Sequence, residues 1–121
     1  MSNPVSQWLV SQQQEMIKLL ADLVNIDSNS FDKKGVDKVA DRLRMFFDTH
    51  SIPHETIPQE NHGDILRVVV SGGEGNRPLL LCGHRDTVFP TGEVEKRPFK
   101  IKDGKAFGPG VADMKLSLIH I

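Results

Sequence analysis

An apolar run that stops at a glycine, followed at once by a histidine and an aspartate, constrains the fold most strongly. The run Leu79–Cys82 is apolar on both sides of the pleat, which predicts a central strand buried on both faces. His84 and Asp86 come directly after it, and Asp113 follows a glycine-rich bend further along the chain. Because α/β proteins place their chemistry just past such strands, this stretch is predicted to form one half of a metal site.

Helical periodicity covers most of the chain before the first strand. Apolar residues at helical spacing predict one helix over residues 5–24. A second helix is predicted to begin after Asp32, whose side chain can cap it, and to end at Ile52-Pro53. The residues between the two helices, Asn25–Asp32, form a polar break.

Strand patterns follow the helices. His54–Pro58 predicts a short edge strand, and Ile65–Val70 predicts a well-buried one because it is apolar on both faces. Phe99–Lys102 and Lys105–Phe107 predict a hairpin, since Asp103-Gly104 between them favours a two-residue turn. This order predicts an α/β class, a mixed β-sheet flanked by helices, and an incomplete sheet whose edges still need partners.

Composition limits the function classes. The 121 residues suffice for one domain, and a net charge of −1 excludes an electrostatic footprint for nucleic acid or an acidic membrane. No apolar run approaches the ~20 residues of a membrane span. The single cysteine fits a reducing compartment, and the N-terminal residues lack the pattern of a signal peptide, so a cytoplasmic location is predicted.

His84, Asp86 and Asp113 are the candidate site residues. A divalent ion such as zinc binds imidazole nitrogen and carboxylate oxygen, which His84 and Asp113 can supply. Asp86 lies two positions after His84, on the same side of an extended chain, and could hold the imidazole ring in place. Asp113 has two oxygens and could bridge two ions ~3.5–4 Å apart. The alternatives are a chance His-x-Asp pattern and an Asp113 that only caps a helix.

Four short motifs occur in order between Leu81 and Lys115. They are Gly83-His84-Arg85-Asp86-Thr87-Val88, Arg97-Pro98-Phe99, Gly104-Lys105-Ala106-Phe107-Gly108-Pro109-Gly110 and Ala112-Asp113-Met114-Lys115. Together they resemble the first metal-binding segment of the M20 family of metallopeptidases, and in particular its glutamate carboxypeptidase (carboxypeptidase G) type. The resemblance implies that residues 1–115 are the N-terminal portion of a zinc-exopeptidase-type catalytic domain.

The resemblance also implies a reaction and roles for the site residues. Family members hydrolyse amide bonds of small peptides or N-acyl amino acids with a pair of zinc ions, for which cobalt or manganese could substitute. His84 corresponds to a ligand of one zinc, Asp113 to the carboxylate that bridges both, and Asp86 to the catalytic acid that orients the His84 ring. A cis peptide bond after Asp113 is expected. Relatives carry a dimerisation domain later in the chain, so a full-length form could be a homodimer.

The chain departs from the family pattern after Lys115. The resemblance implies a general base that is the first glutamate of a Glu-Glu pair, with the second glutamate among the remaining metal ligands. That pair and those ligands are absent from the sequence, and residues 116–121 read Leu-Ser-Leu-Ile-His-Ile where glycines are expected. Residues 116–121 are therefore predicted to be a non-native tail, and the chain to be an N-terminal fragment that is inactive alone. Two alternatives stay open: an N-acyl-amino-acid deacylase (acylase, deacetylase or desuccinylase), and a short non-catalytic binding module.

Overall fold

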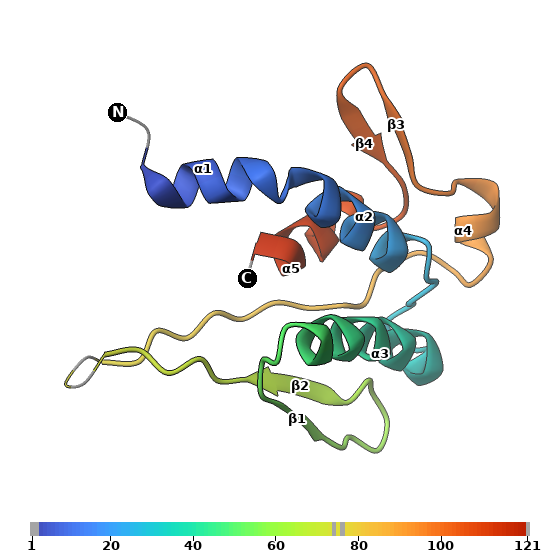
Figure 1. Ribbon diagram of the computed structural model, residues 1–121. Helices are drawn as coiled ribbons and strands as arrows, with labels where there is room; N and C mark the ends of the chain where they lie inside the picture. Colours follow the sequence, from blue (N-terminus) through green and yellow to red (C-terminus); the bar gives the residue numbers. More distant parts are fainter. Residues whose placement is uncertain (1–2, 74, 76, 121) are drawn as a thin grey trace.

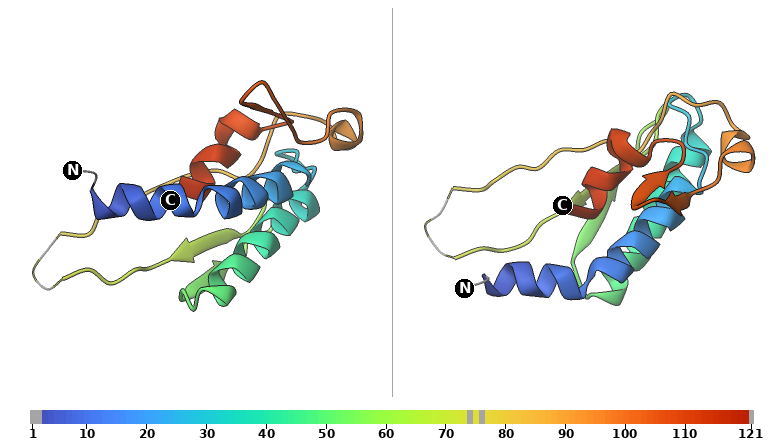
Figure 2. Two further views of the ribbon diagram at one scale, coloured as in Figure 1. Left: turned by 45° about the horizontal axis from the view of Figure 1, so that its top comes forward. Right: turned by 90° about the horizontal axis from the view of Figure 1, so that it is seen from above.

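Three helices form the N-terminal part of the structure, a computed structural model that describes residues 3–73, 75 and 77–120. They are α1 (Pro4–Ser11), α2 (Gln13–Val24) and α3 (Lys33–Thr49). Helices α1 and α2 follow one another along the chain, and α3 lies beside α2 (Figures 1 and 2). The predicted helix over residues 5–24 is confirmed, apart from a break at Gln12.

Local capping explains where two of these helices begin. The side chain of Asn3 accepts a hydrogen bond from the Val5 N–H at 2.9 Å, and Pro4 occupies the first helical turn of α1, where its missing N–H costs nothing. The side chain of Asp32 accepts a hydrogen bond from the Gly35 N–H at 3.2 Å, which confirms the predicted start of α3.

The hydrophobic core lies between α2 and α3. Leu19 and Leu23 from α2 pack with Val39 and Leu43 from α3, and Leu23 and Val39 have no exposed surface. Several half-buried side chains from elsewhere cover this cluster: Ile26, Phe46, Phe47, Leu66, Leu118 and Ile119. The apolar face of the amphipathic helix α3 is thus buried against α2.

The strands pair in two separate antiparallel sheets. Strand β1 (His54–Ile57) pairs with β2 (Ile65–Val68), and β3 (Lys100–Lys102) pairs with β4 (Lys105–Phe107). Asp103 and Gly104 have φ values of 51° and 71°, both positive as a tight two-residue hairpin turn requires, so the predicted hairpin is confirmed. The helix and strand content agrees with the α/β class, but the described residues do not form the single mixed sheet that was expected.

Two predictions of buried strands are wrong. Within Ile65–Val70 the strand stops at Val68, and Val69 and Val70 are exposed. Residues Leu79–Cys82 form no strand, and the side chain of Leu79 is 84% exposed. The side chains of Leu80 and Leu81 are exposed as well, and this part of the chain is drawn in Figure 1 as extended coil without a strand arrow. Burial of an apolar strand needs flanking strands and a covering layer, and the described part of the chain places neither against Leu79–Cys82.

Two short helices lie within and just after Leu81–Lys115, which we call the motif region. Helix α4 (Glu93–Lys96) follows the loop that carries His84, and α5 (Leu116–His120) continues from a kinked turn, Val111–Lys115. Residues 3–73, 75 and 77–120 contain no helix that is both long and apolar enough to cross a membrane.

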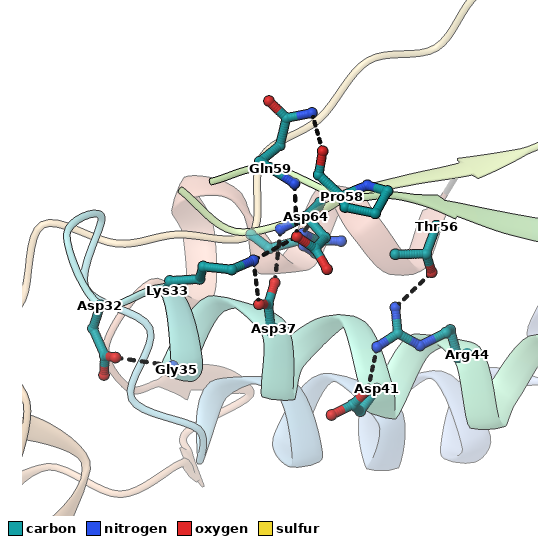
Figure 3. A network of polar contacts seen from close by, with 11 residues as sticks. Asp32, Lys33, Gly35, Asp37, Asp41, Arg44, Thr56, Pro58, Gln59 and Asp64 are labelled. Atoms are coloured by element: carbon teal, nitrogen blue, oxygen red, sulfur yellow. Dashed lines mark hydrogen bonds and ion pairs between the residues drawn. The ribbon is translucent and has the colours of Figure 1, made fainter. Parts of the chain in front are cut away.

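A polar network fastens the β1–β2 loop to α3 (Figure 3). The Lys33 ammonium contacts the carboxylates of Asp37, at 2.8 Å, and of Asp64. The Asp64 N–H donates to Asp37 Oδ1 at 2.7 Å, and the Gln59 N–H donates to Asp64 Oδ1 at 2.9 Å. The Arg85 guanidinium donates to the Asp64 carbonyl, so the same network reaches the motif loop.

Replacing Leu23 by alanine should destabilise the protein strongly, because it opens a cavity in the α2–α3 core. The expected loss is about 2–5 kcal/mol of unfolding free energy, measured by urea denaturation. Leu80→Ala is the matched control: that side chain is 82% exposed, and its loss should change stability by less than about 0.5 kcal/mol. Equal effects of the two substitutions would contradict this placement of the core.

The Asp64 carboxylate should stabilise the fold only above its own pKa. The hydrogen bond from Lys33, followed by that from the Gln59 N–H, holds the pKa of Asp64 below its ordinary 3.8. A carboxyl group whose pKa is lower in the folded than in the unfolded protein stabilises the fold at pH values above its unfolded-state pKa. This stabilisation is lost as the pH falls through its folded-state pKa. Asp64→Asn should therefore lower the urea midpoint at pH 7, and the difference from wild type should shrink as pH falls below 3.8 and through the lower pKa of the folded protein. Glu60→Gln, in the same loop, is the control and should have no effect at either pH.

Candidate metal centre

The structure brings the three sequence-predicted site residues together around one imidazole ring. His84 Nδ1 lies 3.2 Å from Asp86 Oδ1, and His84 Nε2 lies 3.1 Å from Asp113 Oδ1. His84 Nδ1 is also 3.1 Å from the carbonyl oxygen of Asp86. Each ring nitrogen therefore faces a different carboxylate, Nδ1 toward the near neighbour in sequence and Nε2 toward the distant one.

The loop that carries His84 and Asp86 is held by a backbone bridge to the α2–α3 connection. Asn29 and Thr87 form an isolated parallel bridge. In it the Thr87 N–H donates to the Ser28 carbonyl at 2.7 Å, and the Ser30 N–H donates to the Thr87 carbonyl at 3.1 Å. The Asn29 side chain also donates to the Phe89 carbonyl at 3.0 Å. These bonds fix the loop immediately after Asp86.

A tight bend places Asp113 opposite the ring. Gly110 has φ of 72°, a conformation that favours glycine, and a Cβ built there would lie 2.4 Å from Thr87 Cγ2. The peptide bond between Asp113 and Met114 is cis, which confirms the expectation from the resemblance. The side chain of Asp113 is 90% exposed, so its carboxylate is open to solvent apart from the contact with His84.

Lys115 anchors the end of this bend. The residue is almost completely buried, and its Nζ donates to the Ile26 carbonyl at 3.0 Å. Burial lowers the pKa of Lys115 to about 8, against a smaller opposing effect of Asp27. The sequence marked Lys115 only as part of a motif, whereas the structure shows that its amine ties the Asp113 turn to the α2–α3 connection.

Further contacts come from Asn25–Ser30, which we call the linker segment. The Asn25 side chain accepts a hydrogen bond from the Phe99 N–H at 2.8 Å, and Asp27 accepts from the Gly92 N–H at 2.7 Å. The Ser28 hydroxyl donates to the Arg85 carbonyl at 3.1 Å, and the Ser30 hydroxyl donates to Asp86 Oδ2 at 2.5 Å.

The role of the linker segment was missed by reasoning from sequence, which interpreted it only as a polar break between helices. One signal was available: almost every residue in it carries a short side chain that can form hydrogen bonds. Such residues are also typical of ordinary loops. Their partners lie far away in the sequence, as in the bond between Asn25 and Phe99, which are 74 positions apart.

These contacts shift the pKa values of His84 and Asp86. Partial burial pulls the pKa of His84 down, but the contacts with Asp86 and Asp113 outweigh it, and the net shift is above the ordinary 6.5. The hydrogen bond from the Ser30 hydroxyl, followed by weaker effects that include the charge of His84, lowers the pKa of Asp86 below its ordinary 3.8. Asp86 is therefore ionised at neutral pH and can hold the proton on His84 Nδ1.

The donor atoms of His84 and Asp113 fit zinc. Two ligands ~2.0–2.2 Å from a tetrahedral ion lie about 3.3 Å apart, close to the 3.1 Å between His84 Nε2 and Asp113 Oδ1. They line a cavity of about 280 Å³ together with Asp86. Within the described ranges, no group of three or more His, Cys, Asp or Glu residues is placed to hold a metal ion. The described chain thus offers two candidate ligands and not a closed coordination shell.

Comparison with known proteins gives consistent matches. Residues 80–121 match the family model described as Peptidase family M20/M25/M40. The chain is 31% identical to carboxypeptidase G2 of Pseudomonas sp. (strain RS-16), over 93% of this chain and 28% of the relative. It is 48% identical to acetylornithine deacetylase of Pasteurella multocida (strain Pm70), over 50% of this chain and 17% of the relative.

A second acetylornithine deacetylase, from Proteus mirabilis (strain HI4320), is 52% identical over 54% of this chain and 17% of the relative. The chain thus spans less than a third of the length of these relatives. The family match covers the loop and turn that bring His84, Asp86 and Asp113 together. On this evidence residues 80–121, which carry the candidate site, match the peptidase family M20/M25/M40, and the chain is similar to the relatives named above.

Proposed function

We propose that this chain contributes part of a two-zinc centre to a hydrolase that cleaves amide bonds with metal-activated water. The observation that carries the proposal is the placement of His84 between two carboxylates, with Nε2 and Asp113 Oδ1 3.1 Å apart and open to solvent. Relatives named carboxypeptidase G2 and acetylornithine deacetylase support it, because both names describe cleavage of an acyl–nitrogen bond.

The domain assignment follows the same proposal. Residues 1–115 are assigned to the N-terminal portion of a catalytic domain of the zinc-exopeptidase type. Their helices, strands and motif loop are tied together through the linker segment, which supports treating them as one unit. That residues 116–121 are a non-native tail stays a prediction.

The residues of the chain have distinct parts in this chemistry. A bound zinc ion polarises a substrate carbonyl and lowers the pKa of coordinated water, and cobalt or manganese accept similar donors. His84 would hold the ion through Nε2, because Asp86 engages Nδ1 and fixes the proton there. Asp113 would hold it through a carboxylate whose two oxygens allow it to bridge a second ion.

No general base is assigned among the glutamates of the motif region. Glu93 forms an ion pair with Arg97, 2.5 Å from its Nε, and is largely covered. Glu95 lies on the same short helix, α4.

Zinc should bind this chain weakly through the two proposed ligands. Isothermal titration of the purified chain with Zn²⁺ should show weak binding that His84→Ala or Asp113→Ala removes, because each substitution deletes one of two donors. His50→Ala is the control, since His50 is exposed at the C-terminal end of α3 and does not line a cavity with His84, and it should leave binding unchanged. Turnover is not expected. A zinc-dependent hydrolysis rate from the 121-residue chain would overturn that part of the proposal.

The proposal leaves two substrate classes, those of a carboxypeptidase of the G type and those of an N-acyl-amino-acid deacylase. The two acetylornithine deacetylases favour the second class, because they are more identical to this chain than carboxypeptidase G2 is, although only over about half of it. The protein encoded by the whole reading frame around this chain should hydrolyse N-acyl glutamates or folate-like amides if it is a carboxypeptidase of the G type. Preference for N-acetyl or N-succinyl amino acids would identify a deacylase. The measurement is kcat/KM on both panels. Activity on neither panel in the presence of zinc would contradict both assignments.

A further inference from the structure

Ser30 lies outside the four sequence motifs, yet its side chain contacts Asp86, which belongs to the first of them. Its hydroxyl donates to Asp86 Oδ2 at 2.5 Å, and its N–H donates to the Thr87 carbonyl at 3.1 Å. The hydroxyl also lies 3.3 Å from the Thr87 carbonyl, a longer and weaker alternative for its single proton. Backbone and side chain of Ser30 therefore both engage the motif loop.

The two oxygens of Asp86 are divided between two partners. Oδ2 accepts the Ser30 hydroxyl, and Oδ1 faces His84 Nδ1 at 3.2 Å. An aspartate carboxylate has a broad torsional preference about its last bond, so its plane is set by its hydrogen-bond partners. With Oδ2 fixed by Ser30, Oδ1 is directed at the ring, which keeps Nε2 toward Asp113.

Ser28 provides an internal comparison. It lies two positions before Ser30 on the same extended linker segment, and its hydroxyl also donates to the motif loop. Its acceptor is the backbone carbonyl of Arg85, not a side chain, and Ser28 is almost completely buried. Loss of this hydroxyl affects how the loop is anchored, but it leaves both oxygens of Asp86 with their partners.

We propose that Ser30 is a positioning residue of the metal centre, which sets the Asp86 carboxylate so that His84 presents Nε2 to the metal. The inference rests on the proposed zinc site, and it assigns a role to a residue outside the motifs. Partners that orient a metal-binding histidine typically contribute ~10–100-fold to metal affinity. Ser30 acts one contact further away, so the lower end of that range is expected.

The test compares Ser30→Ala with Ser28→Ala in the 121-residue chain, by two measurements. The first is Zn²⁺ affinity by isothermal titration, where Ser30→Ala should weaken binding about 10-fold and Ser28→Ala, which loses only an anchor of the loop, should weaken it much less. The second is the ¹⁵N chemical shifts of the His84 ring in metal-free protein at alkaline pH. Wild type and Ser28→Ala should show the proton on Nδ1, whereas Ser30→Ala should show a mixture of tautomers.

A second pair of variants separates the hydroxyl from the shape of the side chain. Ser30→Thr keeps the hydroxyl and should restore wild-type affinity and tautomer. Ser30→Val has nearly the shape of threonine without the hydroxyl and should behave like Ser30→Ala. If Ser30→Ala does not fold, this pair decides the question, because any steric cost is common to both variants.

The outcomes distinguish this inference from the function that it rests on. Wild-type affinity and tautomer in both Ser30→Ala and Ser30→Val would overturn the role of Ser30, even where zinc binds as proposed. Absence of zinc binding in wild type would overturn the proposed metal site. The tautomer measurement would then decide by itself whether Ser30 orients His84 through Asp86.

Discussion

The candidate metal site depends on one short stretch of polar chain, the linker segment Asn25–Ser30. It reaches the loop that carries His84 and Asp86 by a backbone bridge, and it reaches the Asp113 turn through the buried amine of Lys115. The segment directly joins α2 to α3, whose packed faces form the core, so it has little freedom of its own. The position of the site is therefore set by the packing of two helices that contribute no ligand.

Local signals predicted the elements that depend on neighbouring residues. The Asp32 cap and the apolar stripe of α3 lie within one helix, and Asp103-Gly104 alone determines the β3–β4 turn. The convergence of His84, Asp86 and Asp113 was also expected, partly from the His-x-Asp spacing and partly from the family resemblance. Each of these predictions used either residues that are close in sequence or a motif whose residue spacing indicates the site.

Features that depend on distant partners were not accessible in the same way. The pattern of Leu79–Cys82 indicates an apolar strand, but it does not indicate what would cover it, and in the described chain nothing does. The linker segment has the composition of an ordinary loop, and only the three-dimensional structure shows that Asn25 and Ser30 bond to residues far along the chain. Hydrogen-bonding capacity is visible in a sequence, whereas the choice of partner is not.

The two proposed ligands are held by different means, and this difference explains their exposure. The His84 ring is oriented through side chains, first by Asp86 and then by Ser30. Asp113 has no comparable support for its carboxylate, and its position follows from the backbone bend between Gly110 and Lys115. The proposed bridging role requires both oxygens to be free of competing donors, and support through the backbone leaves them free apart from the contact with His84. Both kinds of support end on the linker segment, at Ser30 for the His84 ring and at Ile26 for the Asp113 turn. The segment therefore links the supports of the two proposed ligands, in addition to the direct contact between His84 and Asp113.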